Sequence, residues 1–120
     1  MKRFKRILIG ILLILLLTLQ VSAKENKQKY KDYAKEQVIN VYKWSIEDYN
    51  NLVKLWQKES GWRVKAKNGK YYGICQTKRS NYGKKYNDYK VQINWGLKYI
   101  KSRHKNPTKA WKFWKKHRWY

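Results

Sequence analysis

Cysteine is nearly missing from this chain, since Cys75 is the only one among 120 residues. A single cysteine excludes an intrachain disulfide, so the core has to hold together without covalent links. For a chain of this size, that favours a mainly α-helical and tightly packed domain.

A long apolar run is missing too. The longest one, Ile7–Leu19, has 13 residues, whereas a membrane-spanning helix needs about 20. Val21-Ser22-Ala23 then supplies the small residues that a signal peptidase reads. We therefore predict a signal peptide over residues 1–23, with an uncleaved membrane anchor at residues 7–21 as the alternative. Either way the domain is expected to work outside the cytoplasm, as a secreted protein or held at the membrane by that anchor. The run is preceded by four cations: Lys2, Arg3, Lys5 and Arg6.

Acidic residues are scarce, at 7 against 30 Lys and Arg. Four of the cations lie in residues 1–23, which leaves 26 in residues 24–120 and a net charge of +19 there. Such a field attracts polyanions. Export argues against nucleic acid, so anionic cell-wall polymers are the expected partners of a monomer, with membrane contact only through an uncleaved N-terminal segment.

Aromatic residues, by contrast, are abundant. All 7 Trp and all 11 Tyr lie in residues 24–120. A core this small cannot bury them all, so several are expected to line a surface groove.

The apolar spacing predicts one helical domain over residues 24–120, which begins with a polar tether at residues 24–29. Start signals stand at the capping box Ser45–Asp48, at Asp88 and at Asn106-Pro107, and Gly61 is a stop signal. Residues 61–76 read as a loop with a short hairpin. The four predicted helices cover residues 30–42, 46–60, 89–103 and 107–117.

Glu59 is the unusual residue of the second helix. On a helical wheel it falls between Leu52 and Leu55, on the apolar face. Burial and the negative end of the helix dipole both raise the pKa of such a carboxyl, which suits a general acid. The alternative is that Glu59 turns outward or pairs with a Lys at the helix end.

A second acid within about 5–9.5 Å, as a two-carboxylate glycosidase needs, is hard to find. Glu47 and Asp48 lie about 16–18 Å before Glu59 along the same helix. Only Asp88 could approach, and its position favours a helix cap. The site therefore offers one acid.

Three stretches, "LWQKESGW", "YYGICQ" and "QINWGLKYIKSRHKNPTKAWKFWKKHRWY", resemble the lysozyme-like transglycosylase domain of secreted Gram-positive and phage peptidoglycan lytic enzymes. The likeness is strongest to the compact version at the C-terminus of aggregation-promoting factors, and it spans residues 50–120. It implies a lysozyme-like α+β fold with the catalytic Glu at the end of a buried helix. It also implies cleavage between N-acetylmuramic acid and N-acetylglucosamine with formation of a 1,6-anhydro sugar.

Carried over residue by residue, the resemblance makes Glu59 the catalytic acid and Ser60 its partner. Gly73 and Gln76 match residues that line the cleft. Ala110-Trp111 stands where many relatives have an Ala-Tyr-Asn step, but no Asn follows Trp111 here. Cys75 stands where relatives usually carry Pro or Met. Four aromatic residues are candidates for stacking on sugars, with the core as the alternative place for each: Trp62, Tyr72, Tyr99 and Trp111.

Other functions remain open at this stage. A hydrolytic muramidase would share the fold. A thiol peptidase would pair Cys75 with His104 or His117, although no motif surrounds them. A non-enzymatic, cationic wall- or membrane-disrupting protein would rely on charge and Trp alone. We expect no cofactor and no metal, because the two His lack a ligand-like spacing.

Overall fold

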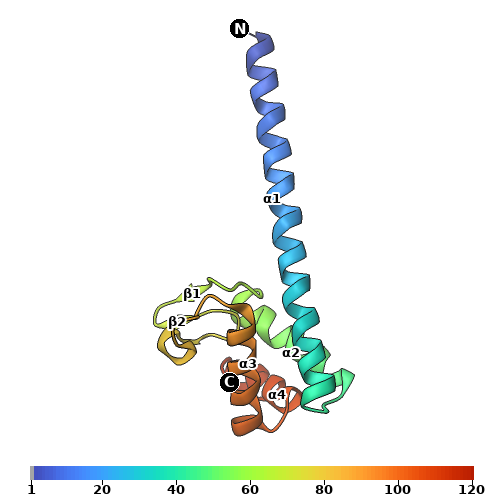
Figure 1. Cartoon of the computed structure of the whole chain (residues 1–120), viewed down its shortest axis with the longest axis vertical. Helices are drawn as coiled ribbons and strands as arrows, with labels where there is room; N and C mark the ends of the chain where they lie inside the picture. The colour runs from blue at the N-terminus through green and yellow to red at the C-terminus, as the bar shows by residue number, and fades with distance from the viewer. Residues whose placement is uncertain (1) are drawn as a thin grey trace.

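The computed structural model describes the backbone of residues 2–120 and the side chains of residues 14–120. Helix α1 (Lys2–Glu36) continues into a π-helical turn, η1 (Gln37–Val41). Figure 1 shows α1 projecting from a compact body that holds the other elements, and the chain measures 63 × 30 × 30 Å. Residues 1–13 of the predicted signal peptide, with their four cations, lie outside the residues whose side chains are described. Among those that are, no helix is long and apolar enough to span a membrane.

The polar tether predicted for residues 24–29 is wrong, because these residues continue α1. Lys, Glu and Gln are good helix formers, and no Gly or Pro interrupts the segment. Gln28 Nε2 also donates to Asp32 Oδ1 one turn later, at 2.8 Å. The end of this helical region joins the core through Ala34 and Val38, both fully buried.

Helix α2 (Ile46–Ser60) has the boundaries that its sequence predicts. Ser45 Oγ accepts from Asp48 N at 3.1 Å, and Asp48 Oδ2 accepts from Ser45 N at 3.1 Å, which completes the capping box. At the other end Gly61 adopts φ +62°, a left-handed conformation that Gly tolerates without strain. The N–H of Gly61 donates to the Gln57 carbonyl at 3.0 Å.

The predicted hairpin is confirmed, and it gains a third strand. Strands β1 (Lys67–Asn68), β2 (Tyr71–Tyr72) and β3 (Thr77–Lys78) form an antiparallel sheet in that order. Lys67 pairs with Tyr72, and Tyr72 in turn pairs with Thr77. A 3-10 turn, η2 (Arg79–Tyr82), follows the sheet.

Helices α3 (Tyr89–His104) and α4 (Pro107–His117) also begin where predicted. The side chain of Asp88 accepts from Lys90 N at 2.8 Å, and that of Asn106 accepts from Lys109 N at 2.9 Å. The described residues thus form a mainly helical body with one small sheet.

Helix α3 is central, as its wide apolar surface predicts. A Cβ on Gly96 would lie 2.6 Å from Trp56 Cζ2 and 2.9 Å from Cys75 Cβ, so only Gly lets α3 approach so closely. Helix α4 packs along α2. The core between these elements contains Leu52, Leu55, Trp56, Trp62, Ile74, Ile93, Leu97, Ile100 and Ala110.

Candidate active site

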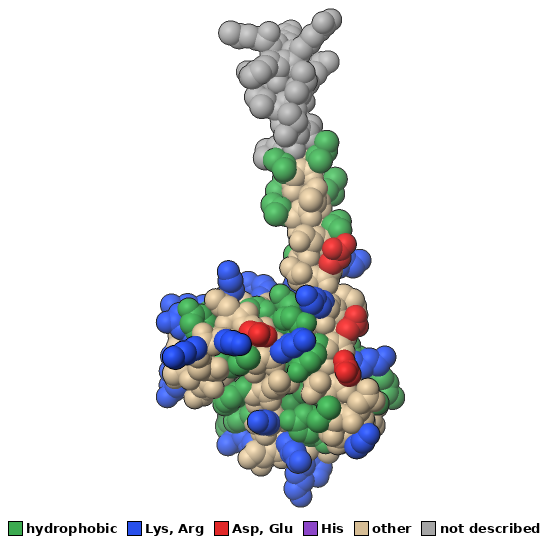
Figure 2. All heavy atoms as spheres, in the orientation of Figure 1, with side chains coloured by type: hydrophobic (Ala, Val, Ile, Leu, Met, Phe, Trp, Pro, Cys, Tyr) green, Lys and Arg blue, Asp and Glu red, His purple; other side chains and the backbone are tan. Residues whose placement is uncertain are grey.

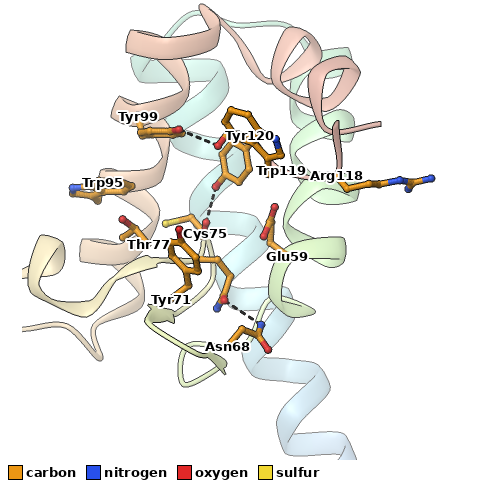
Figure 3. A pocket seen from close by; sticks show the side chains of 11 residues that line it. Glu59, Asn68, Tyr71, Cys75, Thr77, Trp95, Tyr99, Arg118, Trp119 and Tyr120 are labelled. Carbon is orange, nitrogen blue, oxygen red and sulfur yellow. Dashed lines mark hydrogen bonds between the residues drawn. The ribbon is translucent and has the colours of Figure 1, made fainter. Parts of the chain in front are cut away.

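A cleft of about 500 Å³ opens between the end of α2, the sheet, α3 and the segment after α4. Figure 3 draws the 11 side chains that line it, with Glu59 entering from α2 and Trp95 and Tyr99 from α3. Five of the lining residues are aromatic: Tyr71, Trp95, Tyr99, Trp119 and Tyr120. The cleft therefore combines one carboxyl with a largely aromatic wall.

Glu59 is half-buried in this cleft. Burial raises its pKa to about 7, because water no longer solvates the charged form fully, and hydrogen bonding with the Trp114 side chain opposes that rise. The predicted upward direction is confirmed. At neutral pH the carboxyl is therefore close to half-protonated, and it can donate or accept a proton in a reaction.

No other Asp or Glu lines the cleft among the residues with described side chains. Asp48 is buried at the far end of α2, where it receives hydrogen bonds from Ser45 and Thr108. Asp88 is the exposed cap of α3. Both acids have the local roles that the sequence favours, and no second carboxyl lies beside Glu59 in the described cleft lining.

Gln76 reaches the cleft as predicted, and its side chain is held on three sides. Its Nε2 donates to the carbonyls of Ala66, at 3.1 Å, and Gly73, at 2.8 Å. Its Oε1 accepts from Asn68 Nδ2 at 3.1 Å. These bonds lock the loop between β2 and β3, although Gln76 itself adopts φ +58°. Asn68 and Gln76 thus form a rigid polar edge of the cleft.

Stacked rings form the wall on α3. Trp95 and Tyr99 are one turn apart and lie 5.4 Å from each other at an interplanar angle of 12°. Tyr99 also donates its hydroxyl to the Tyr120 backbone carbonyl at 2.9 Å. The predicted position of Tyr99 at the cleft is therefore present in the structure.

Tyr120 secures the floor of the cleft. Its hydroxyl accepts from Trp56 Nε1 at 2.9 Å and donates to the Cys75 carbonyl at 2.8 Å. The chain can return to this position because Arg118 ends α4 in a left-handed conformation, with φ +65°. One side chain thus joins α2, the sheet loop and the segment after α4.

Cys75 is not placed for nucleophilic catalysis. Its side chain is 2% exposed, its thiol contacts the Tyr82 hydroxyl at 3.1 Å, and burial raises its pKa to about 12. His104 packs instead against Phe113, Tyr99 and Tyr120. The thiol peptidase alternative is therefore contradicted, since a reactive Cys needs a lowered pKa and access to substrate.

Five predicted site residues lie outside the cleft lining. Trp62 is fully buried in the core and donates its indole N–H to the Val53 carbonyl, so its stacking on a sugar is excluded. Ser60 Oγ donates to the Ile74 carbonyl at 2.6 Å and so anchors the sheet loop to α2 rather than facing a ligand.

The remaining three are Tyr72, Gly73 and Trp111. Tyr72 donates its hydroxyl to Asn87. A Cβ on Gly73 would lie 2.5 Å from Gln92 Oε1, so Gly73 permits a close approach to that buried amide. Trp111 stacks on Trp114 at 5.4 Å, which makes it a neighbour of the residue whose side chain lowers the pKa of Glu59.

Several cleft residues are not among those predicted from the sequence, and only some of them have a signal there. Trp95 is one helical turn before Tyr99, so the two had to share a face. Nothing local marked Asn68, Tyr71, Thr77, Arg118, Trp119 and Tyr120 as cleft residues.

No family model, no curated protein and no solved structure matches this chain. The geometry of the cleft is therefore the observation on which a function has to be argued.

Proposed function

We propose that this protein is a peptidoglycan lytic transglycosylase with Glu59 as its single catalytic acid. One observation carries the proposal: Glu59 is the only acidic side chain that lines the described cleft, and burial raises its pKa to about 7. A carboxyl whose pKa lies near the working pH is suited both to give and to take a proton. A two-carboxylate hydrolase would need a second acid about 5–9.5 Å away.

The walls of the cleft suit a sugar chain. Aromatic rings stack on the apolar faces of sugars, and Trp95, Tyr99 and Trp119 offer such surfaces. Asn68 and Gln76 supply amide groups at the opposite edge. An elongated, mostly uncharged polymer backbone would find both apolar and hydrogen-bonding contacts here.

The lysozyme-like fold belongs to this proposal. It is supported by an acid in the last turn of a helix, beside a three-stranded sheet, in a mainly helical body. The net charge of +19 on residues 24–120 supports an anionic wall as the place of action.

In the reaction that the resemblance implies, protonated Glu59 gives its proton to the glycosidic oxygen between N-acetylmuramic acid and N-acetylglucosamine, and the bond from C1 to that oxygen breaks. Glu59, now a carboxylate, takes the proton of the muramyl C6 hydroxyl, whose oxygen bonds to C1. The product carries a 1,6-anhydro ring, Glu59 is protonated again, and no water is consumed. One acid is enough for both steps.

The first prediction tests Glu59 and the product together. Glu59→Gln keeps the shape of the side chain but removes the transferable proton, so digestion of purified peptidoglycan should fall at least ~10²-fold. Wild-type protein should release muropeptides that are lighter by one water than hydrolysis products. Mass spectrometry of the released fragments measures both.

Glu47→Gln is the matched control, because Glu47 is exposed on the same helix and should keep full activity. Digestion by Glu59→Gln at the wild-type rate would show that the cleft is not the active site. Reducing-end fragments would indicate a hydrolytic muramidase, and the absence of fragments would indicate a binding protein.

A further inference from the structure

A second hollow, of about 180 Å³, lies on the small sheet and shares Tyr71 with the cleft. Three cations line it and no acid does: Lys67 on β1, Lys70 in the turn before β2, and Arg79 after β3. Figure 2 shows Lys and Arg side chains gathered around the end of the molecule where Figure 1 draws β1 and β2. We call this space, with its three cations, the basic hollow.

Two of its cations lie over aromatic rings. Lys70 Nζ lies 5.4 Å from the centre of the Tyr71 ring. Arg79 Cζ lies 4.9 Å from the centre of the Tyr86 ring, which is itself packed edge-on against Tyr72 at 5.9 Å. Such contacts reduce the entropy that a long side chain loses when it binds a ligand. These two cations are therefore pre-positioned, although their side chains are exposed.

Tyr71 links this hollow to the candidate active site. It forms part of the wall of both spaces, so a branch on a sugar chain in the cleft would reach the basic hollow as it passes Tyr71. The sugar backbone is uncharged, and the cleft lining contains Arg118 as its only cation. The basic hollow, with three cations and no acid, therefore offers more positive charge to the charged groups of the same polymer than the cleft does.

We propose that the basic hollow binds oxyanions carried on the glycan strand, and specifically the carboxylates of its stem peptides. This inference rests on the proposed function. A guanidinium binds a carboxylate through two parallel hydrogen bonds, and the two ammonium groups add charge without demanding one geometry. The hollow would make the protein prefer strands that still carry peptides over bare glycan.

The test compares two triple variants of equal charge. Lys67→Gln, Lys70→Gln and Arg79→Gln together remove the basic hollow. Lys24→Gln, Lys54→Gln and Lys109→Gln together remove three exposed cations that line neither space. Both sets are placed in the full chain with Glu59→Gln, so that strands are not degraded, and circular dichroism checks the fold.

Calorimetry at low salt then measures Kd for glycan strands with and without stem peptides. Removing the hollow should weaken binding to peptide-bearing strands about tenfold, as expected for three exposed charges that each contribute modestly. Binding to stripped strands should not change. The control triple should stay within about threefold on both, and an equal loss in the two triples would overturn the proposal in favour of net charge.

A third ligand separates the two sources of oxyanion. Phosphodiester polymer purified from walls should bind both triples alike. If the variant without the basic hollow lost affinity tenfold for that polymer alone, the assignment to peptide carboxylates would be overturned and phosphate would be the ligand of the hollow.

A measurement without glycan keeps this inference distinct from the proposed function. Free stem peptide, titrated into ¹⁵N-labelled wild-type protein, should shift the backbone amides of Lys67, Lys70 and Arg79. Such shifts in a protein that never cleaves peptidoglycan would leave the hollow standing and reject the transglycosylase. Cleavage of peptidoglycan without such shifts, and without a difference in Kd between the two triple variants, would reject the proposal for the basic hollow and leave the transglycosylase standing.

Discussion

At the scale of single residues, two opposing effects set the proton affinity of Glu59. Burial raises its pKa to about 7, and the hydrogen bond with Trp114 lowers it. Trp114 is itself held in place, because it stacks on Trp111 at 5.4 Å and the Arg118 guanidinium lies 5.0 Å from its ring centre. The indole is thus held in the position from which it lowers the pKa of Glu59.

This arrangement predicts the pH dependence of the proposed reaction. The first step needs protonated Glu59, so the rate should fall as pH rises through about 7. Trp114→Phe removes a bond that favours the charged form, so the pKa rises and the falling limb should move to higher pH. Initial rates on soluble glycan strands between pH 5 and 9 measure the shift.

Trp44→Phe is the control, since Trp44 stacks on Tyr42 outside the cleft lining and is not among the groups that shift the pKa of Glu59. The rate of this variant should fall over the same pH range as the rate of the wild type. A limb that moves to lower pH in Trp114→Phe, or equally in both variants, would contradict the role given to Trp114.

The position of Glu59 could be predicted from the sequence, whereas the influence of Trp114 on it could not. Apolar spacing and Gly61 placed the carboxyl on the buried face at a helix end, and both are local signals. Trp114 reaches it from α4 only because α4 packs along α2. Contacts between distant segments depend on packing that one-dimensional periodicity does not contain.

At the scale of secondary-structure elements, Asp48 ties two helices together. One carboxylate oxygen completes the capping box of α2, and the other accepts from Thr108 Oγ1 at 2.6 Å in the first turn of α4. Asn51 Nδ2 also donates to Thr108 Oγ1, at 3.0 Å. A residue that reads as an ordinary cap in the sequence therefore also fixes the α2–α4 contact that carries Trp114 to Glu59.

Removing Asp48 should destabilise the protein more than loss of a cap alone. Asp48→Ala leaves donors of Ser45 and Thr108 without their acceptor, which should cost about 2–3 kcal/mol in the free energy of unfolding. Glu47→Ala, one residue earlier and exposed, should change it by less than about 0.5 kcal/mol. Urea unfolding at pH 7 measures both, and equal values would contradict the linking role.

The same bonds predict how this contribution varies with pH. Burial alone would raise the pKa of Asp48, but hydrogen bonds from Thr108 and Ser45 outweigh it and hold the pKa below its ordinary value. A depressed pKa in the folded state means that the stabilisation is complete above the unfolded value and is lost as pH falls through the folded one. The difference in the free energy of unfolding between wild type and Asp48→Ala should therefore become smaller only at acidic pH.

The elements themselves were largely predictable, because their ends depend on nearby residues. The caps at Ser45, Asp88 and Asn106 all hold in the structure. The tether predicted at residues 24–29 is wrong because polar residues are not by themselves a loop signal, and the residue types here favour helix once α1 has begun. The segment Arg118–Tyr120 had no periodic signal, and it enters the site through a left-handed residue and tertiary hydrogen bonds.

At the scale of the whole molecule, charge and cleft have separable roles. The 26 cations of residues 24–120 act on any polyanion, but screening limits their reach to about 8 Å at physiological ionic strength. Glu59 and the rings around it act at contact distance, in a space that is partly closed to water. Salt should therefore weaken attraction to the wall while leaving the chemistry almost unchanged.

The last prediction compares salt dependence on two substrates. Clearing of whole walls should fall steeply between 50 and 500 mM NaCl (about 14 to 4 Å of Debye length), whereas turnover of short, uncharged glycan strands should change less than about twofold. Screening also relieves repulsion among the cations, so a loss of clearing cannot be ascribed to unfolding. Parallel rate measurements on the two substrates test this. Equal salt slopes would mean that charge alone carries recognition, and the shaped cleft would then have no part in choosing the substrate.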